Sequence, residues 1–345
     1  MTERAPLATG SAPRMPAAAK RPRILSGMRP TGRLHLGNYL GALQNWVQLQ
    51  ESSENFHMVA DWHTLTTDYE HTDQIRSNTL EMVTDWLAAG IDPEKSPVFV
   101  QSRVKEHAEL HLIFSMLVTT SRLERNPTVK EQARDLDLED RLSYGHLGYP
   151  VLQAADILLY KANLVPVGED QVPHVELTRE VARRFNSIYG EVFPVPEPKL
   201  TKFPRVPGLD GRRMSKSLGN TILLADSPEE IAAKIKTAYT DPKKIRLGDP
   251  GNPDGCVVFA YHQAFNASNA PAIDKACRAG QLGCVADKKD LSAIVAERLA
   301  PFRERRRELE AHPERVLEAL RHGEERARAI AQETMREVRH AMRME

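Results

Sequence analysis

The stretch ILSGMRPTGRLHLGNYLGAL, residues 24–43, decides the fold of this chain. Residues 24–26 are typical of a short buried strand, and Gly27, Pro30 and Gly32 then supply the chemistry of a turn. From Leu34 to Val47, apolar residues recur at helical spacing. The stretch therefore predicts a strand, a glycine-rich loop and a helix in that order.

The same alternation of strands and helices continues downstream. We expect strands at 56–60, 98–100 and 165–167, and helices at 73–89, 107–134 (with a break near Asn126), 149–160 and 174–188. Such alternation favours a parallel sheet that is covered on both faces. The predicted fold class is α/β, with a Rossmann-like parallel-sheet domain and a C-terminal helical domain. Ligands of such sheets bind beyond the carboxyl ends of the strands, so the motifs that follow strands should face one crevice.

Composition divides the chain into segments. Residues 1–20 are rich in alanine and proline, which predicts a disordered tail. Residues 194–208 are rich in proline and predict a rigid connector, and helical patterns follow from Ser227 onward. The predicted segments are the tail at 1–20, the Rossmann-like domain at 21–206, a connector with a mobile loop at 207–225, a helical domain at 226–305, and a C-terminal helix at 306–345 that packs back on the first domain.

The overall composition narrows the class of protein. The 47 basic residues balance 47 acidic residues, so any face that binds nucleic acid must be a local patch. The apolar run at 112–118 is too short to span a bilayer, which excludes a membrane role. Three cysteines argue against a disulfide framework and favour the reducing cytoplasm.

The first motif that carries chemistry is PTGRLHLGN, residues 30–38. Gly32 and Gly37 have no Cβ, so the backbone can approach a flat ligand closely there. His35 and Asn38 are three residues apart, on one face of the opening helical turn. The N-terminus of that helix attracts phosphate through its free N–H groups and its dipole. The alternative is an ordinary capped helix start with a solvent-facing histidine.

The second motif is RMSKS, residues 213–217, flanked by Gly211 and Gly219. Two cations and two hydroxyls on a mobile loop suit a polyanion whose charge shifts during a reaction. Lys216 can follow that charge as a mobile donor. The alternative is a basic surface loop.

Together the two motifs resemble the paired signatures of class I aminoacyl-tRNA synthetases. The resemblance implies that the first motif holds the adenine and phosphates of ATP, and that the second closes over the pyrophosphate. His35, Asn38, Arg213 and Lys216 are then the expected catalytic residues, with Lys216 stabilising the transition state. The carboxylate of the amino acid attacks the α-phosphate, so no covalent nucleophile is needed. Arg213 stands where the family usually has Lys, which keeps the charge and changes the hydrogen-bond geometry.

Three strings resemble the tryptophanyl branch of that family, in its bacterial form: residues 26–43, residues 149–158 (YPVLQAADIL) and residues 165–171 (VPVGEDQ). Asp156 interrupts an otherwise apolar helix face, where a carboxylate is costly unless it has a partner. An indole N–H is only a donor, so a tryptophan pocket requires a buried acceptor. The alternative role for Asp156 is an N-cap or an ion pair.

The resemblance implies two sets of binding residues. The tryptophan set is Gly27, His63, Tyr149, Asp156, Val165, Val167 and Gln171. The ATP set, with Mg²⁺ expected beside the nucleotide, is Arg29, Pro30, Thr31, Gly37, Asn38, Gly168, Glu169, Asp170, Val206, Arg213, Met214, Ser215, Lys216 and Ser217. Two positions depart from the commonest bacterial pattern, Gln153 in place of Met and Arg29 in place of Gln. Either change can alter the polarity of the pocket or the binding of the substrate's ammonium group.

The cysteines all lie past residue 226, in the pattern C-x20-C-x6-C-x2-D formed by Cys256, Cys277, Cys284 and Asp287. Some members of the family hold an iron–sulfur cluster on four cysteines at similar spacing. Such clusters usually require four thiolates, and aspartate is a harder ligand that suits them poorly. We therefore predict the relic of a lost site rather than a metal centre. A labile cluster with one carboxylate ligand is the alternative.

The resemblance also implies partners. They are L-tryptophan, tRNA(Trp) and a second copy of the chain, with residues 107–123 as the candidate homodimer interface. Residues 226–305 should read the anticodon, since phosphate contacts position a nucleic acid and base contacts identify it. The densest basic patch there is Lys234, Lys236, Lys243, Lys244 and Arg246. For any single lysine, the alternative is a solvated helix face.

Three other functions are compatible with some of these sequence motifs. A tyrosyl-tRNA synthetase has both ATP motifs, but the strings at 24–43 and 149–158 argue against it. A small adenylyltransferase shares only the loop that contains His35, so the intact 213–217 loop argues against that class. A regulator that binds tRNA or tryptophan without catalysis would not need intact ATP motifs.

Overall fold

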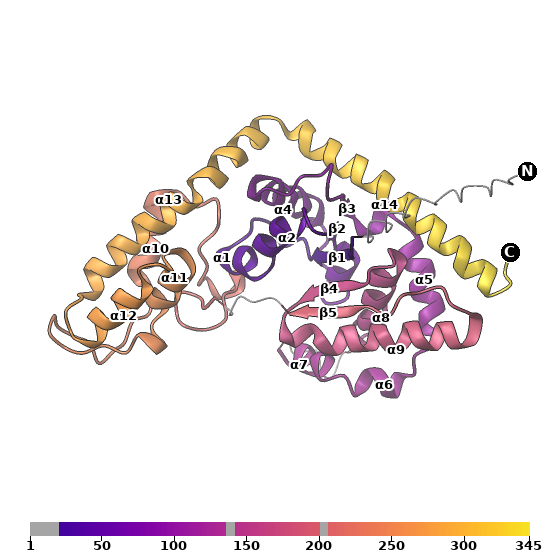
Figure 1. Ribbon diagram of the computed structural model, residues 1–345, viewed down its shortest axis with the longest axis horizontal. Helices are drawn as coiled ribbons and strands as arrows, with labels where there is room; N and C mark the ends of the chain where they lie inside the picture. The colour runs from indigo at the N-terminus through magenta and orange to yellow at the C-terminus, as the bar shows by residue number, and fades with distance from the viewer. Residues whose placement is uncertain (1–20, 136–141, 201–205) are drawn as a thin grey trace, which may run out of the picture.

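The computed structural model describes residues 21–135, 142–200 and 206–345, apart from the side chains of Gln132, Asp135 and Asp170. The predicted tail at 1–20 lies outside the described residues. Five parallel strands form one sheet in the order β3-β2-β1-β4-β5, so the α/β prediction is confirmed (Figure 1). The strands are β1 (Arg23–Met28), β2 (Glu54–Val59), β3 (Val98–Val100), β4 (Leu164–Val167) and β5 (Glu197–Leu200). Strands β2 and β3 lie on one side of β1, and β4 and β5 lie on the other. This reversal of strand order creates a crevice at the carboxyl ends of β1 and β4.

Strand β5 corrects one prediction. Its residues fall in the proline-rich stretch at 194–208, which predicted a rigid connector, yet they pair in parallel with β4. Pro198 lies opposite Val165, and a proline is tolerated because β5 is an edge strand that needs hydrogen bonds on one side only. Exposed Glu197 and Lys199 give this strand no apolar pattern. Residues 201–205 of the same stretch lie outside the described residues.

Helices cover both faces of the sheet (Figure 1). One face packs its core against α5 (Glu106–Ser115), α8 (Tyr144–Leu159), α9 (Val172–Tyr189) and α14 (Pro313–Ala341). The other packs against α1 (Leu36–Asn38), the π-helical turn η1 (Tyr39–Leu43), α2 (Gln44–Leu49) and α4 (Ile75–Ala89). Strand β2 shows why two layers form: Phe56 and Met58 enter the first core, and Val59 enters the second. A strand that is buried on both faces is what a parallel sheet requires.

The helix predicted at 107–134 is three helices. They are α5, α6 (Thr120–Glu124) and α7 (Pro127–Asp135). The break between α5 and α6 was not predicted from the sequence. Pro127 begins α7, and the first position of a helix does not need the N–H that proline lacks. The described residues also form the short elements α3 (Asp61–Leu65), η2 (Gln101–Arg103), η4 (Glu169–Gln171) and η5 (Lys216–Leu218).

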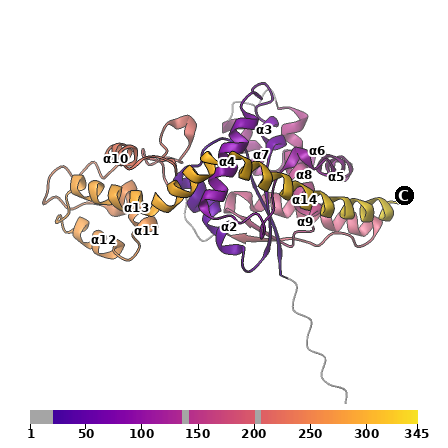
Figure 2. The same ribbon diagram turned by 90° about the horizontal axis from the view of Figure 1, so that it is seen from above.

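The helical part of the chain lies to one side of the sheet (Figures 1 and 2). It contains α10 (Pro228–Thr237), η6 (Pro253–Gly255), α11 (Val257–Phe265), α12 (Ala270–Arg278) and α13 (Cys284–Ala311). Helix α13 continues past residue 305 and reaches α4, where Arg306 forms an ion pair with the buried Asp85. The other carboxylate oxygen of Asp85 accepts the Leu34 N–H at 2.6 Å. The first motif is therefore tied to the long helix of the helical part.

The last helix, α14, lies against β3, α4 and α5. Gly323 sits directly on β3, where a Cβ atom would come within 2.0 Å of the Val98 carbonyl oxygen. Close approach of the helix to the strand therefore requires glycine at this position. Ala327, Ala331 and Met335 continue the buried stripe along the helix. Among the described residues, no helix is long and apolar enough to cross a membrane.

One buried side chain makes stability depend on pH. His57 on β2 is fully buried, stacks on Trp46 with 4.7 Å between ring centroids, and neither ring nitrogen has a hydrogen-bond partner. Burial lowers the pKa of His57 from 6.5 to about 3, because a charged imidazole is disfavoured away from water.

We expect acidification to destabilise the protein through this residue. The unfolded chain binds a proton near pH 6.5, whereas the folded chain does so only near pH 3, so stability is lost as the pH falls between these values. The loss from His57 between pH 7 and pH 5 should be about 2 kcal/mol. Urea unfolding at both pH values should therefore show a smaller loss for His57→Phe than for the unmodified chain. An equal loss in both proteins would contradict the assignment.

Candidate active site

The first motif begins a helix and its histidine caps that helix. His35 precedes α1, its Nδ1 accepts the Asn38 backbone N–H at 3.3 Å, and the Asn38 Oδ1 accepts the His35 N–H at 3.1 Å. Burial, together with the charges of Lys216 and Arg213, lowers the pKa of His35 from 6.5 to about 4. The ring is therefore neutral near pH 7. Since Nδ1 accepts a hydrogen bond, Nε2 carries the proton and can donate it to a ligand.

The second motif folds onto the first. The Lys216 ammonium donates to the Thr31 carbonyl oxygen at 2.5 Å, and the Gly37 N–H donates to the Met214 sulfur at 3.3 Å. Within the loop, Ser215 and Ser217 hydroxyls are hydrogen bonded at 2.9 Å. In sequence, most of the sheet domain separates the two motifs. The fold brings them into contact.

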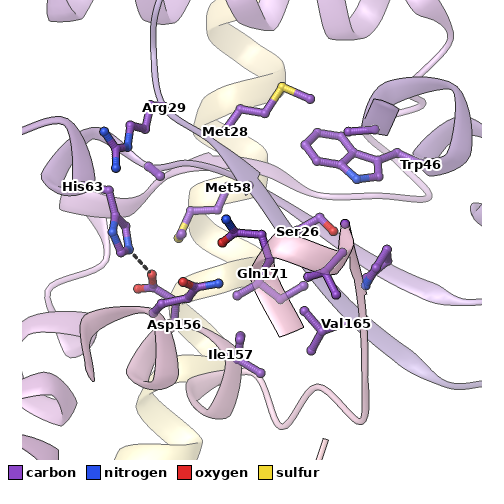
Figure 3. Close-up of a pocket in the computed structure, with 18 of the residues that line it drawn as sticks. Ser26, Met28, Arg29, Trp46, Met58, His63, Asp156, Ile157, Val165 and Gln171 are labelled. Atoms are coloured by element: carbon purple, nitrogen blue, oxygen red, sulfur yellow. Dashed lines mark hydrogen bonds and ion pairs between the residues drawn. The ribbon is translucent and has the colours of Figure 1, made fainter. Parts of the chain in front are cut away.

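A pocket of about 500 Å³ opens at the carboxyl ends of β1 and β4 (Figure 3). All of the predicted tryptophan-binding residues line it, and so do three of the predicted ATP-binding residues. These are Gly27, His63, Tyr149, Asp156, Val165, Val167 and Gln171, with Arg29, Gly168 and Arg213. Ser26, Met28, Trp46, Met58 and Gln153 complete much of the wall. At Gly27 a Cβ atom would lie 2.7 Å from the Met58 carbonyl oxygen, so the strand needs glycine there.

The other predicted residues lie around this pocket or apart from it. Pro30, Thr31, Gly37 and Asn38 follow β1, and Thr31 and Gly37 contact the loop that holds Met214, Ser215, Lys216 and Ser217. Glu169 is exposed in η4, next to the lining residue Gly168. Val206 is half-buried and packs on the second core. The Asp170 side chain lies outside the described part of the chain.

Asp156 is the best-connected polar group of the pocket. One carboxylate oxygen accepts from the Gln101 amide at 2.7 Å and pairs with His107 Nδ1 at 2.7 Å. The other oxygen pairs with His63 Nε2 at 2.7 Å (Figure 3). Burial acts to raise the pKa of Asp156, but the hydrogen bonds and charges of His107 and His63 outweigh it, and the pKa is held well below its usual range. Asp156 is therefore a buried carboxylate that stays ionised.

Gln101 and His107 were not predicted as site residues. Gln101 comes directly after β3, so its place at the carboxyl edge of the sheet was a usable signal. His107 lies in the first turn of the apolar helix α5, is fully buried, and contacts the Tyr160 hydroxyl at 2.9 Å through Nε2. Its role depends on a contact with α8, which the sequence of α5 does not reveal.

Tyr149 forms the wall next to His63. Its hydroxyl is hydrogen bonded to His174 Nε2 at 2.9 Å, and its ring meets the His63 ring edge-on at 6.5 Å. Burial raises the pKa of Tyr149, and the nearby Arg29 charge opposes this effect. Tyr149 is therefore a neutral phenol whose orientation is held by α9.

The cysteine segment was predicted to be the relic of a lost metal site, and this stays a prediction. Cys256, Cys277 and Cys284 are free and half-buried, and burial raises the pKa of Cys256 and Cys277, which favours neutral thiols. Asp287 is instead bound to His262, with 3.1 Å between Oδ1 and Nε2. Among the described residues, no three His, Cys, Asp or Glu side chains are grouped to hold a metal ion.

The predicted basic patch is smaller than its sequence suggests. Lys234 pairs with Asp226 at 2.6 Å, and Lys244 is buried with its ammonium on the Asp249 carbonyl oxygen. Lys236, Lys243 and Arg246 are exposed. Only these three side chains of the patch can meet a nucleic acid without breaking an existing contact.

Comparison with known proteins agrees with this geometry. A family model described as tRNA synthetases class I (W and Y) matches residues 17–300. The tryptophan–tRNA ligase of Thermotoga maritima is 53% identical over 325 residues, which cover 93% of this chain and 99% of the relative. The tryptophan–tRNA ligase of Aquifex aeolicus is 44% identical, over 93% of this chain and 100% of the relative.

A solved structure extends the comparison to the fold. Tryptophanyl-tRNA synthetase from Campylobacter jejuni, in complex with ADP and tryptophan, superposes with a TM-score of 0.82 at 35% identity, over 93% of this chain and 99% of that one. This chain belongs to the class I family of tRNA synthetases that contains the tryptophan and tyrosine enzymes. Within that family it belongs with the tryptophan–tRNA ligases. The predicted family and the predicted enzyme class are thereby confirmed.

Proposed function

We propose that this chain activates L-tryptophan with ATP in the pocket beside Asp156 and transfers the tryptophanyl group to tRNA(Trp) for protein synthesis. The observation that supports this most directly is the closure of the 213–217 loop onto the first motif. Lys216 contacts Thr31 and Met214 contacts Gly37, while Arg213 of the same loop lines the pocket that contains Asp156. One site can thus hold an amino acid and a nucleotide side by side.

The tryptophan side of the site is built around Asp156. One of its oxygens already accepts from both Gln101 and His107, whereas the other has only His63. A carboxylate oxygen has two lone pairs, so the oxygen that meets His63 can also accept the indole N–H. Val165, Val167 and Gly27 would pack on the ring, and Gln171 and Tyr149 would face the polar end of the substrate.

The ATP side uses the two motifs. The neutral His35 can donate from Nε2, and the Lys216 ammonium can move from the Thr31 carbonyl to the phosphates, which are better acceptors because they are charged. Gly168 and Glu169 would border the ribose. ATP would arrive as its magnesium complex, and the ion would neutralise part of the negative charge of the phosphates.

The reaction then needs position and charge rather than a protein nucleophile. A carboxylate oxygen of tryptophan attacks the α-phosphorus, the bond to the β-phosphate breaks, and pyrophosphate leaves. Lys216, with Arg213, would stabilise the charge that grows on the leaving group. In the second step a ribose hydroxyl at the tRNA terminus attacks the tryptophanyl carbonyl, and AMP leaves.

Exposed side chains outside the pocket suggest where the protein binds tRNA and a second copy of itself. We propose that residues 226–305 read the anticodon with the exposed Lys236, Lys243 and Arg246. We also propose a cytoplasmic homodimer that uses residues 107–123, because Leu112 on α5 and Met116 just after that helix are 58% and 72% exposed. Large apolar side chains that face solvent on one helix favour a protein partner.

Amino-acid-dependent ATP–pyrophosphate exchange tests the function. We expect the purified protein to catalyse exchange with tryptophan and with none of the other nineteen standard amino acids, because the pocket presents an acceptor for an indole N–H. Exchange with tyrosine instead would move the chain to the tyrosine branch. The absence of exchange with every amino acid would favour a regulator that lacks catalysis.

A further inference from the structure

Arg29 is a cation without an anionic partner in the part of the chain that the structure describes. It follows β1 directly, lines the pocket, and is half-buried. Its guanidinium donates to the Thr67 hydroxyl at 3.2 Å. In the described residues no carboxylate forms an ion pair with it, although most arginines that are equally buried here do have one, such as Arg23 with Glu54 and Arg179 with Glu176. Burial lowers the pKa of Arg29, which reflects the cost of a charge that has lost water and gained no counter-ion.

The position of Arg29 indicates which substrate provides that anion. The charges of Lys216 and Arg213 act on His35, on the nucleotide side of the site. The charge of Arg29 acts instead on Tyr149 and His146. Figure 3 shows Arg29 beside His63, on the side of the pocket opposite Trp46. Arg29 therefore belongs to the wall that contains Tyr149 and His63, and His63 is bound to Asp156.

The chemistry of a guanidinium narrows the choice of the anion that binds Arg29. It is planar and offers parallel N–H groups that match the two oxygens of a carboxylate. An amino acid whose indole donates to Asp156 must extend its α-carboxylate away from that residue, along the wall of Tyr149 and His63. The phosphates of ATP already have two cations, Lys216 and Arg213, on the loop that closes over them.

We propose that Arg29 is a substrate-binding residue that binds the α-carboxylate of tryptophan and holds it for attack on ATP. This inference rests on the proposed function. One carboxylate oxygen would be held by the guanidinium, and the other would remain available to attack the α-phosphorus. The fixed orientation would hold the carboxylate near the reactive geometry, which lowers the entropic part of the activation barrier. The assignment differs from the ATP-binding role that the family resemblance implies for this position.

Direct binding without ATP tests the proposal. Titration calorimetry would compare L-tryptophan with L-tryptophanamide, which keeps the indole and the ammonium group but has no carboxylate. We expect Arg29→Gln to lower the affinity for tryptophan by about 10- to 100-fold, the range for hydrogen bonds to a charged group, and to leave the affinity for the amide unchanged. Arg29→Lys, which keeps the charge and loses the paired geometry, should fall between. Arg212→Gln is the matched control, because Arg212 is exposed and bound to Asp210.

The possible results test the role of Arg29 and the proposed function separately. An equal loss for tryptophan and its amide in Arg29→Gln would overturn the proposal, since it would indicate a structural role. An unchanged affinity for tryptophan with a raised KM for ATP would also overturn it and would assign Arg29 to the nucleotide. If Arg29→Gln does not fold, Arg29→Lys decides in the same two ways. Failure of the unmodified protein to bind tryptophan would refute the proposed function itself, and the carboxylate assignment with it.

Discussion

Asp156→Asn is expected to weaken strongly the preference of this protein for an indole N–H, because a neutral amide oxygen is a weaker acceptor than a carboxylate. The exchange rate with tryptophan, as kcat/KM, should fall by about 10²–10³-fold, because removing one partner of a buried charged hydrogen bond typically costs 2–5 kcal/mol. The substitution preserves shape but replaces a carboxylate that three side chains bind. An amide nitrogen would then face His63 or the pair formed by Gln101 and His107.

An analogue makes this prediction specific. In 3-benzothienylalanine, sulfur replaces the indole N–H and the ring shape is kept. The unmodified protein should activate tryptophan far better than this analogue, by up to about 10⁴–10⁵-fold, because the analogue leaves a buried acceptor unpaired. In Asp156→Asn this difference between the two substrates should become smaller, because the acceptor that remains is uncharged. Retention of the full preference in the variant would show that another group recognises the indole nitrogen.

The second large effect is expected at Lys216. Lys216→Ala should lower kcat of tryptophan-dependent exchange by about 10²–10³-fold, the usual loss for one donor that stabilises developing charge. KM for tryptophan should change little, because Lys216 acts on the leaving group and not on the bound amino acid. A variant that lowers kcat and kcat/KM equally has lost an interaction made only in the transition state.

Lys95→Ala is the matched control for Lys216. Lys95 is an exposed lysine that pairs with Glu51 at 2.5 Å, and exposed pairs contribute little to stability. Its removal should leave exchange unchanged. Exchange at the normal rate in Lys216→Ala would mean that the contact between Lys216 and Thr31 belongs to a resting arrangement of the loop and has no part in the reaction.

Much of the site could be predicted because its chemistry is carried by contiguous motifs. The turn residues and the helical spacing in residues 24–43 are local properties, and the structure has a strand, a loop and a helix there. The same holds for residues 165–171, which form β4 and η4. The edge strand β5 escaped prediction because an edge strand needs no apolar pattern, and its prolines are compatible with both a strand and a connector.

The sequence by itself determined the α/β class, the family and the residues that follow β1 and β4, because strand and helix signals repeat over short distances along the chain. Only the tertiary structure decided which groups surround Asp156. Gln101 reaches it from the end of β3, His107 from α5 and His63 from α3. Likewise only the fold placed Lys216 on Thr31, and left Arg29 in the pocket without a carboxylate partner among the described residues. The reason is physical: the charge of a buried group depends on side chains that are distant in sequence and meet only when the sheet, its helices and the loop have packed together.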